Sequence, residues 1–162
     1  MHRILFFLFL FSAVMACNTS ENNDETKTET PTATQEEVYL PSLPMDELKI
    51  LWDSCNAVDF LYYELPISTS LNDRYSIQQS LRHVSEVPVS LAFKNNCKPI
   101  ARVFYKNEGE DLIEAEIYFS QGCSFYVFFK NGKPVFSNLM TNEGIKHFNE
   151  IIQKALSLQP TR

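Results

Sequence analysis

The sequence predicts an α+β domain, in which helices pack on an antiparallel meander sheet. Four apolar stretches with strand character follow one another in the second half of the chain, separated by short turns, and short turns join antiparallel strands. Apolar residues at three- and four-residue spacing lie before and after this block, as in helices that pack on a core. The predicted architecture is therefore a four- to five-stranded meander sheet packed by an N-terminal helix, a short middle helix and a C-terminal helix.

The N-terminal helix is predicted to begin after Ser42, with Pro44 in its first turn, where the missing N–H of proline is tolerated. Its apolar face consists of Leu48, Leu51, Trp52, Cys55 and Val58. The segment that follows, residues 59–70, fits either a continuation of this helix or a strand, and we favour a strand. Asn72 or Asp73 then caps a short helix. The apolar positions of this middle helix are Ile77, Leu81 and Val84.

The strands and the C-terminal helix follow from alternation and turn residues. The predicted strands are residues 100–106, 112–119, 123–130 and 133–139. Asn131 and Gly132 separate the last two strands, and this dipeptide favours a type I′ hairpin turn, which needs positive φ at both positions. Thr141 is predicted to cap the C-terminal helix. The apolar face of that helix consists of Ile145, Phe148, Ile152 and Leu156.

The register of the strands is predicted from their apolar pairs. A turn at residues 120–122 that places Phe119 opposite Cys123 gives the further pairs Ile117 with Phe125, Ala115 with Val127, and Ile113 with Phe129. The preceding hairpin gives the pairs Ala101 with Ile117, Val103 with Ala115, and Tyr105 with Ile113. Arg102 then lies opposite Glu116 on the other face of the sheet. About half of the side chains on that face are polar.

Three cysteines follow residue 38, namely Cys55, Cys97 and Cys123. The predicted register places Cys97 opposite residue 121, at the same end of the sheet as Cys123. A disulfide needs α-carbons within about 7 Å of each other, so we predict a Cys97–Cys123 disulfide. Cys55 is then a small buried hydrophobic residue on the first helix.

The first residues form a targeting segment. Arg3 precedes an apolar run over residues 4–11, which is typical of a secretory signal peptide and too short to span a bilayer, because a span needs about 20 residues. Val14-Met15-Ala16-Cys17 then resembles the bacterial lipobox. The resemblance covers residues 1–17 and implies cleavage before Cys17, a diacylglycerol on its thiol and an acyl group such as palmitate on the new amino terminus. An ordinary cleaved signal peptide and an uncleaved anchor are the alternatives.

The formal net charge of −6 belongs mainly to the segment that follows Cys17. Residues 18–37 contain six acids, one lysine and no large apolar side chain, so they bury too little surface to fold. Residues 38–162 contain fourteen acids and twelve bases. The predicted organisation is a signal peptide (1–16), a lipidated cysteine with a disordered acidic tether (17–37) and a single α+β domain (38–162).

No sequence motif identifies a catalytic, metal or cofactor site. The chain lacks a Gly-x-Ser-x-Gly elbow, a glycine-rich phosphate loop and a Cys-x-x-Cys pair. His83 and His147 lack the close spacing of metal ligands, and we predict neither a metal nor a cofactor. Glu114 and Glu116 share a strand face, where Arg102 gives them a structural role. Basic residues are spread among acids, which argues against a nucleic-acid partner.

The candidate binding surface is aromatic. In the predicted register, Tyr118, Tyr126 and Phe128 lie on the same sheet face as the two glutamates, opposite the core. Exposed aromatic clusters often form contacts with ligands or proteins. The alternative is that residues 58–70 or a loop cover these side chains.

These features predict a lipid-anchored protein of the bacterial cell envelope, on the outer membrane and facing the periplasm or the cell surface. We expect a noncatalytic binding or accessory module whose partner is another envelope protein or a small ligand. The alternatives are a small hydrolase or thiol-dependent enzyme, and an inhibitor or immunity-type protein. An enzyme requires a concave pocket with two or more titratable side chains within hydrogen-bond reach, whereas the binding module predicts an exposed aromatic face.

Overall fold

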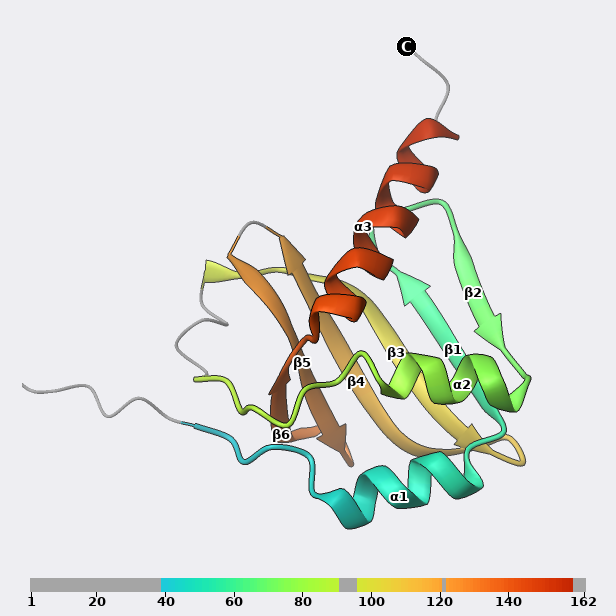
Figure 1. Ribbon diagram of the computed structural model, residues 1–162, viewed down its shortest axis with the longest axis vertical. Helices are drawn as coiled ribbons and strands as arrows, with labels where there is room; N and C mark the ends of the chain where they lie inside the picture. The colour runs from blue at the N-terminus through green and yellow to red at the C-terminus, as the bar shows by residue number, and fades with distance from the viewer. Residues whose placement is uncertain (1–38, 91–95, 121, 159–162) are drawn as a thin grey trace, which may run out of the picture. The chain divides into compact units, whose positions relative to one another are not determined.

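The computed structural model describes residues 39–90, 96–120 and 122–158, so the predicted signal peptide, Cys17 and the tether lie outside the described residues. The described residues form one antiparallel sheet with strand order β2-β1-β3-β4-β5-β6 and three helices (Figure 1). The elements are α1 (Met45–Ser54), β1 (Ala57–Tyr62), β2 (Ser68–Leu71), α2 (Arg74–Leu81), β3 (Pro99–Asn107), β4 (Glu110–Ser120), β5 (Cys123–Lys130), β6 (Lys133–Leu139) and α3 (Asn142–Ser157). The α+β class is confirmed, with six strands rather than four or five.

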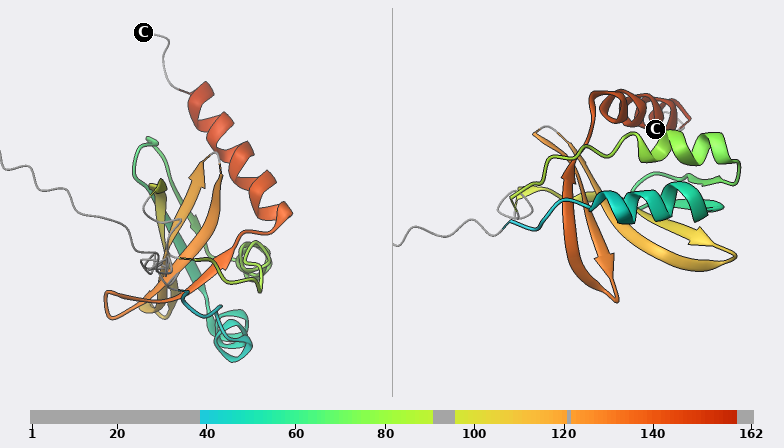
Figure 2. Two further views of the ribbon diagram at one scale, coloured as in Figure 1. Left: turned by 90° about the vertical axis from the view of Figure 1, so that its left-hand side faces the viewer. Right: turned by 60° about the horizontal axis from the view of Figure 1, so that its bottom comes forward.

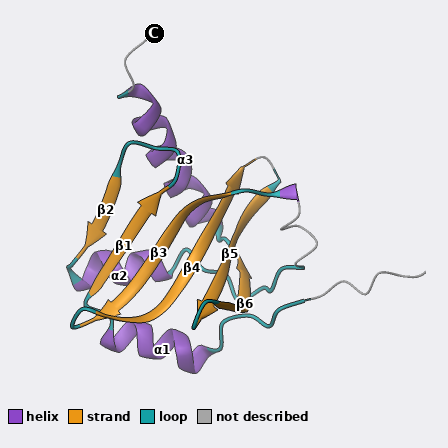
Figure 3. Cartoon of the chain, turned by 180° about the vertical axis from the view of Figure 1, so that it is seen from behind, coloured by secondary structure: helices purple, strands orange, loops and turns teal. Residues whose placement is uncertain are grey.

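All three helices lie on one face of the sheet, as Figures 2 and 3 show from different sides. We call this the inner face and the opposite one the outer face. Inward side chains alternate along each strand and form the main hydrophobic core together with helix residues such as Leu51, Leu81 and Phe148. The strand residues in this core are Val58, Phe60, Tyr62, Ala101, Val103, Tyr105, Ile113, Ala115, Ile117, Tyr126 and Phe128.

The two additional strands come from the segment after α1. That helix ends at Ser54, and Val58 belongs to β1 rather than to the helix. The burial of β1 alternates, with Val58 and Phe60 inward and Leu61 half-exposed outward, which is the period of a strand. β1 pairs with β3 on one side and with β2 on the other. The preference for a strand in this segment is therefore confirmed, but the strand folds back as a hairpin.

The predicted register of β3 and β4 is confirmed. Ala101 pairs with Ile117, Val103 with Ala115, and Tyr105 with Ile113, while Arg102 pairs with Glu116. The predicted register of β4 and β5 is wrong by one residue, because Ser120 rather than Phe119 pairs with Cys123. This pairing leaves two residues in the turn instead of three. Gly122 has a φ of 83°, a conformation that glycine adopts without steric cost.

The predicted turn and caps are present. Asn131 and Gly132 both have positive φ, at 53° and 72°, as a type I′ turn requires. The Asp73 side chain accepts a hydrogen bond from Ser76 N at the start of α2. The Thr141 side chain accepts one from Gly144 N at the start of α3. Each cap satisfies a backbone donor that the helix itself leaves free.

The outer edge of β6 is covered by two chain segments that run beside it. Ser137 donates its backbone N–H to Pro41 O at 2.9 Å, and Leu139 donates to Val87 O at 2.8 Å. The buried Asn138 side chain accepts from Leu43 N at 2.9 Å and donates to Ser85 O at 2.7 Å. The two segments are therefore attached by hydrogen bonds to the C-terminal end of β6, where Ser137 and Asn138 are buried.

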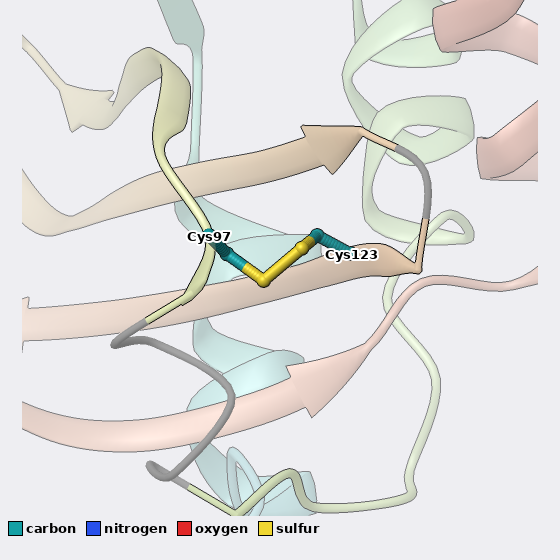
Figure 4. Close-up of a disulfide and its surroundings, with 2 residues drawn as sticks. All are labelled: Cys97 and Cys123. Carbon is teal, nitrogen blue, oxygen red and sulfur yellow. A yellow bond between two sulfur atoms is a disulfide. The ribbon is translucent and has the colours of Figure 1, made fainter.

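The predicted Cys97–Cys123 disulfide is present (Figure 4), with a separation of 6.0 Å between the α-carbons. It joins the segment before β3 to the first residue of β5. The disulfide belongs to a second hydrophobic cluster on the outer face, whose buried members are Val89, Cys97, Tyr118, Cys123, Phe125, Val127 and Phe129. Cys55 is free and buried at the end of α1.

We expect the disulfide to stabilise the domain by about 3 to 4 kcal/mol, because it closes a loop with a sequence separation of 26 residues. Urea unfolding of the oxidised protein and of the Cys97→Ser/Cys123→Ser variant measures this difference. Alkylation under denaturing, non-reducing conditions should modify Cys55 but neither Cys97 nor Cys123. Equal unfolding free energies, with all three thiols alkylated, would contradict the assignment.

Candidate functional site

A cavity of about 620 Å³ lies between the β1–β2 hairpin and helices α2 and α3. Its volume falls in the range of about 300 to 1,000 Å³ that is typical of small-molecule sites. The side chains around it come from four elements and their flanking residues: Phe60, Tyr62, Ile67, Ser68, Thr69, Leu71, Tyr75, Ser76, Gln79, Ser80, His83, His147, Ile151, Lys154, Ala155 and Leu158.

One end of the cavity is a corner where the end of α2 meets the start of α3. Thr141 donates its backbone N–H to His83 O at 2.8 Å, and its hydroxyl donates to Arg82 O at 3.1 Å. Gly144 in the first turn of α3 has no room for a side chain, because a Cβ would lie 2.8 Å from the Cβ of His83. The two helices diverge from this corner (Figure 1), and the space between them opens over β1 and β2.

The two histidines of the described residues meet at this corner. The ring centroids of His83 and His147 lie 4.7 Å apart. Burial, together with the charge that His147 would carry, lowers the pKa of His83 to about 4. Burial also lowers the pKa of His147, although Glu150 acts in the opposite direction. Both imidazoles are therefore neutral at pH 7, where each offers one hydrogen-bond donor and one acceptor.

The walls of the cavity are largely apolar because of helical and strand periodicity. On α3, His147, Ile151 and Ala155 follow one another at intervals of four residues, so they share one face of the helix. Phe60 and Leu71 belong to β1 and β2. On α2 the lining residues Ser76, Gln79 and Ser80 are short or polar and Tyr75 is an exposed aromatic residue, because Ile77 and Leu81 of that helix are directed into the main core. The result is an apolar surface with a polar strip along α2.

Two polar groups of the lining have unusual surroundings. The Tyr62 hydroxyl is buried and has no hydrogen-bond partner among the described residues, and burial raises the pKa of this side chain to about 12. It therefore remains a protonated donor that lacks an acceptor. The Ser80 hydroxyl, in contrast, donates to Ile77 O at 2.7 Å.

The predicted aromatic binding face is corrected by the register of β5. Because β4 and β5 pair one residue away from the predicted register, Tyr126 and Phe128 point to the inner face and are buried in the main core. Tyr118 does lie on the outer face, but it is only 1% exposed. Its ring stacks on Phe125 at 4.5 Å, and its hydroxyl donates to Glu116 at 2.6 Å. These three aromatic residues form core contacts rather than an exposed surface.

The paired glutamates have the structural role that the sequence predicts. Arg102 Nε donates to Glu114 Oε2 at 2.8 Å, and the guanidinium of Arg102 lies over the rings of Phe104 and Phe129. Glu116 accepts from Tyr118, as described above. Both carboxylates are thus engaged on the outer face, outside the lining of the cavity.

The sequence did not identify the cavity, although it singled out His83 and His147 individually. Among the residues that the structure describes, no group of three or more His, Cys, Asp or Glu side chains is arranged to hold a metal ion. Nor does any helix in the described ranges have the length and apolar character that crossing a membrane requires. Comparison of the chain with protein-family models, with curated proteins and with solved structures found no significant match.

We expect the domain to lose stability as the pH falls from about 6.5 to about 4, because the unfolded state protonates His83 at about 6.5 whereas the folded state does so at about 4. Urea unfolding across this window should give a shallower loss for His83→Gln than for the wild type. Asp59 and Asp73, whose pKa values hydrogen bonds lower, act mainly at and below the acid end of this window, and His147, whose pKa burial lowers, contributes within it in both proteins. Identical pH dependence in the two proteins would show that His83 does not titrate in this way.

Proposed function

We propose that this protein is a lipid-anchored module of the bacterial cell envelope that binds a small, largely apolar ligand in the cavity between the β1–β2 hairpin and helices α2 and α3. The cavity is the observation that carries the proposal. Its volume of about 620 Å³ and its mainly apolar walls, with a few convergent polar groups, are the features of small-molecule sites. The buried state of Tyr118, Tyr126 and Phe128 favours this site over the aromatic sheet face.

The anchor is supported by the sequence of residues 1–37. The apolar run and Val14-Met15-Ala16-Cys17 resemble a lipoprotein signal, and several acyl chains hold a protein on a membrane more firmly than one. The acidic segment after Cys17 would act as a flexible spacer. We place the domain on the outer membrane, facing the periplasm or the cell surface.

Noncatalytic binding is the role that the lining of the cavity favours. Nucleophilic catalysis by a serine requires a base within hydrogen-bond reach of its hydroxyl. Of the three serines in the lining, Ser68, Ser76 and Ser80, the buried Ser80 donates its hydroxyl to the Ile77 carbonyl instead. The lining contains no aspartate or glutamate among the described residues. The neutral imidazoles of His83 and His147 are suited to orienting a ligand by hydrogen bonds.

Partly filling the cavity should weaken binding. Gln79 lines the cavity, whereas its neighbour Gln78 on the same helix does not, so Gln79→Trp and Gln78→Trp form a matched pair. The probe is N-phenyl-1-naphthylamine, a neutral apolar dye whose fluorescence rises on leaving water. We expect saturable binding by the wild type and by Gln78→Trp, and affinity reduced at least about tenfold in Gln79→Trp. Equal affinities in the two folded variants, or no binding by the wild type, would refute the proposed site.

The anchor is tested with Cys17→Ala in a bacterial host, by metabolic labelling with a palmitate analogue and by membrane fractionation. The wild type should be labelled and should pellet with the outer membrane, because the thiol at residue 17 accepts the lipid. Cys17→Ala should be unlabelled and should lose the anchor. A labelled Cys17→Ala protein would contradict lipidation at this residue.

A further inference from the structure

We propose that the cavity selects apolar carboxylates, with the apolar body held between the helices and the β1–β2 hairpin and the anionic head group placed at Lys154. This inference rests on the proposed ligand-binding role of the cavity and adds the chemical class of the ligand. It is carried by the charge of the lining and by the position of Lys154.

The lining of the cavity contains a basic side chain, Lys154, and no acidic one among the described residues. Its titratable side chains are two tyrosines, two histidines and one lysine: Tyr62, Tyr75, His83, His147 and Lys154. None of the described residues that line the cavity is acidic, although acids outnumber bases in the sequence as a whole. An apolar cation would therefore meet a like charge without a compensating carboxylate in the lining, whereas an anion would meet an ammonium group.

Lys154 is available for this role. No described carboxylate lies within salt-bridge distance of its ammonium group, although Glu150 is one turn away on the same helix. The side chain is exposed, so its flexible stem lets the charge stay in water at the rim of the cavity while the apolar walls continue inward. Ionic pairing at the rim and apolar burial inside are what an amphipathic anion requires.

The cavity is elongated enough to separate the two ends of such a ligand. His147 at the corner and Lys154 both line it and are seven residues apart on α3, which corresponds to about 10 Å along the helix axis. Between them on the same helix face lies Ile151, and Phe60 and Leu71 add apolar surface from the strands that line the cavity. The apolar stretch therefore runs from the neutral imidazole corner towards the charged end.

Isothermal titration calorimetry with three probes that share one tail tests the proposal on the full chain: dodecanoate, dodecanol and dodecyltrimethylammonium, each below its micelle concentration. We expect the wild type to bind dodecanoate at least about tenfold more tightly than dodecyltrimethylammonium. Lys154→Met should bring this ratio close to one while leaving dodecanol binding unchanged. Lys154→Arg should retain the preference, and so should Lys146→Met, which removes an exposed lysine of α3 outside the lining.

The outcomes separate the two proposals. Equal affinity of the wild type for the carboxylate and the ammonium probe overturns the selection of carboxylates and needs no variant to interpret. A preference that persists in Lys154→Met overturns the role of that residue. If the neutral dye binds at the cavity in either of these cases, ligand binding itself stands. If neither the dye nor any of the three probes binds, both proposals fail together.

Discussion

The contact between the end of α2 and the start of α3 is the constraint on which the candidate site depends. The backbone bond from Thr141 to His83 and the close approach of Gly144 to His83 hold the two helices together at one point. Both helices must also cover the inner face of the sheet, through Ile77 and Leu81 on one side and Phe148 on the other. Two helices that are joined at one end and laid on a twisted sheet diverge, and the cavity is the space that this divergence leaves.

The fold follows from the sequence wherever a local rule applied. Alternation in β3 and β4 predicted their pairing residue by residue, because a shift by one residue would have turned every apolar side chain outward. The same rule failed for β5, since both of its faces are buried: Tyr126 and Phe128 belong to the main core, while Phe125 and Val127 belong to the outer cluster. A strand that is apolar on both faces carries no alternation from which a register can be inferred, and the turn length decided it instead.

The same rules could not predict the candidate site, because a cavity forms where side chains of different elements do not pack against one another. Its lining residues are spread over nearly a hundred positions, from Phe60 to Leu158, and none belongs to a motif. His83 and His147 were visible as the two histidines of the folded region, but their contact depends on the angle between two helices. The disulfide, by contrast, was predicted because Cys97 and Cys123 were placed by strand pairing alone.

Under the proposed lipid anchoring, copies of the protein would diffuse in two dimensions and meet often, and the two edges of the sheet then determine whether copies can pair. Unpaired strand edges are templates for pairing between molecules. The backbone bonds to Pro41 and Val87 occupy the C-terminal end of the edge at β6, at Ser137 and Leu139. The edge at β2 is only four residues long and carries three hydroxyl side chains, Ser68, Thr69 and Ser70. Crowding on a surface therefore offers neighbouring copies little backbone through which their sheets could merge.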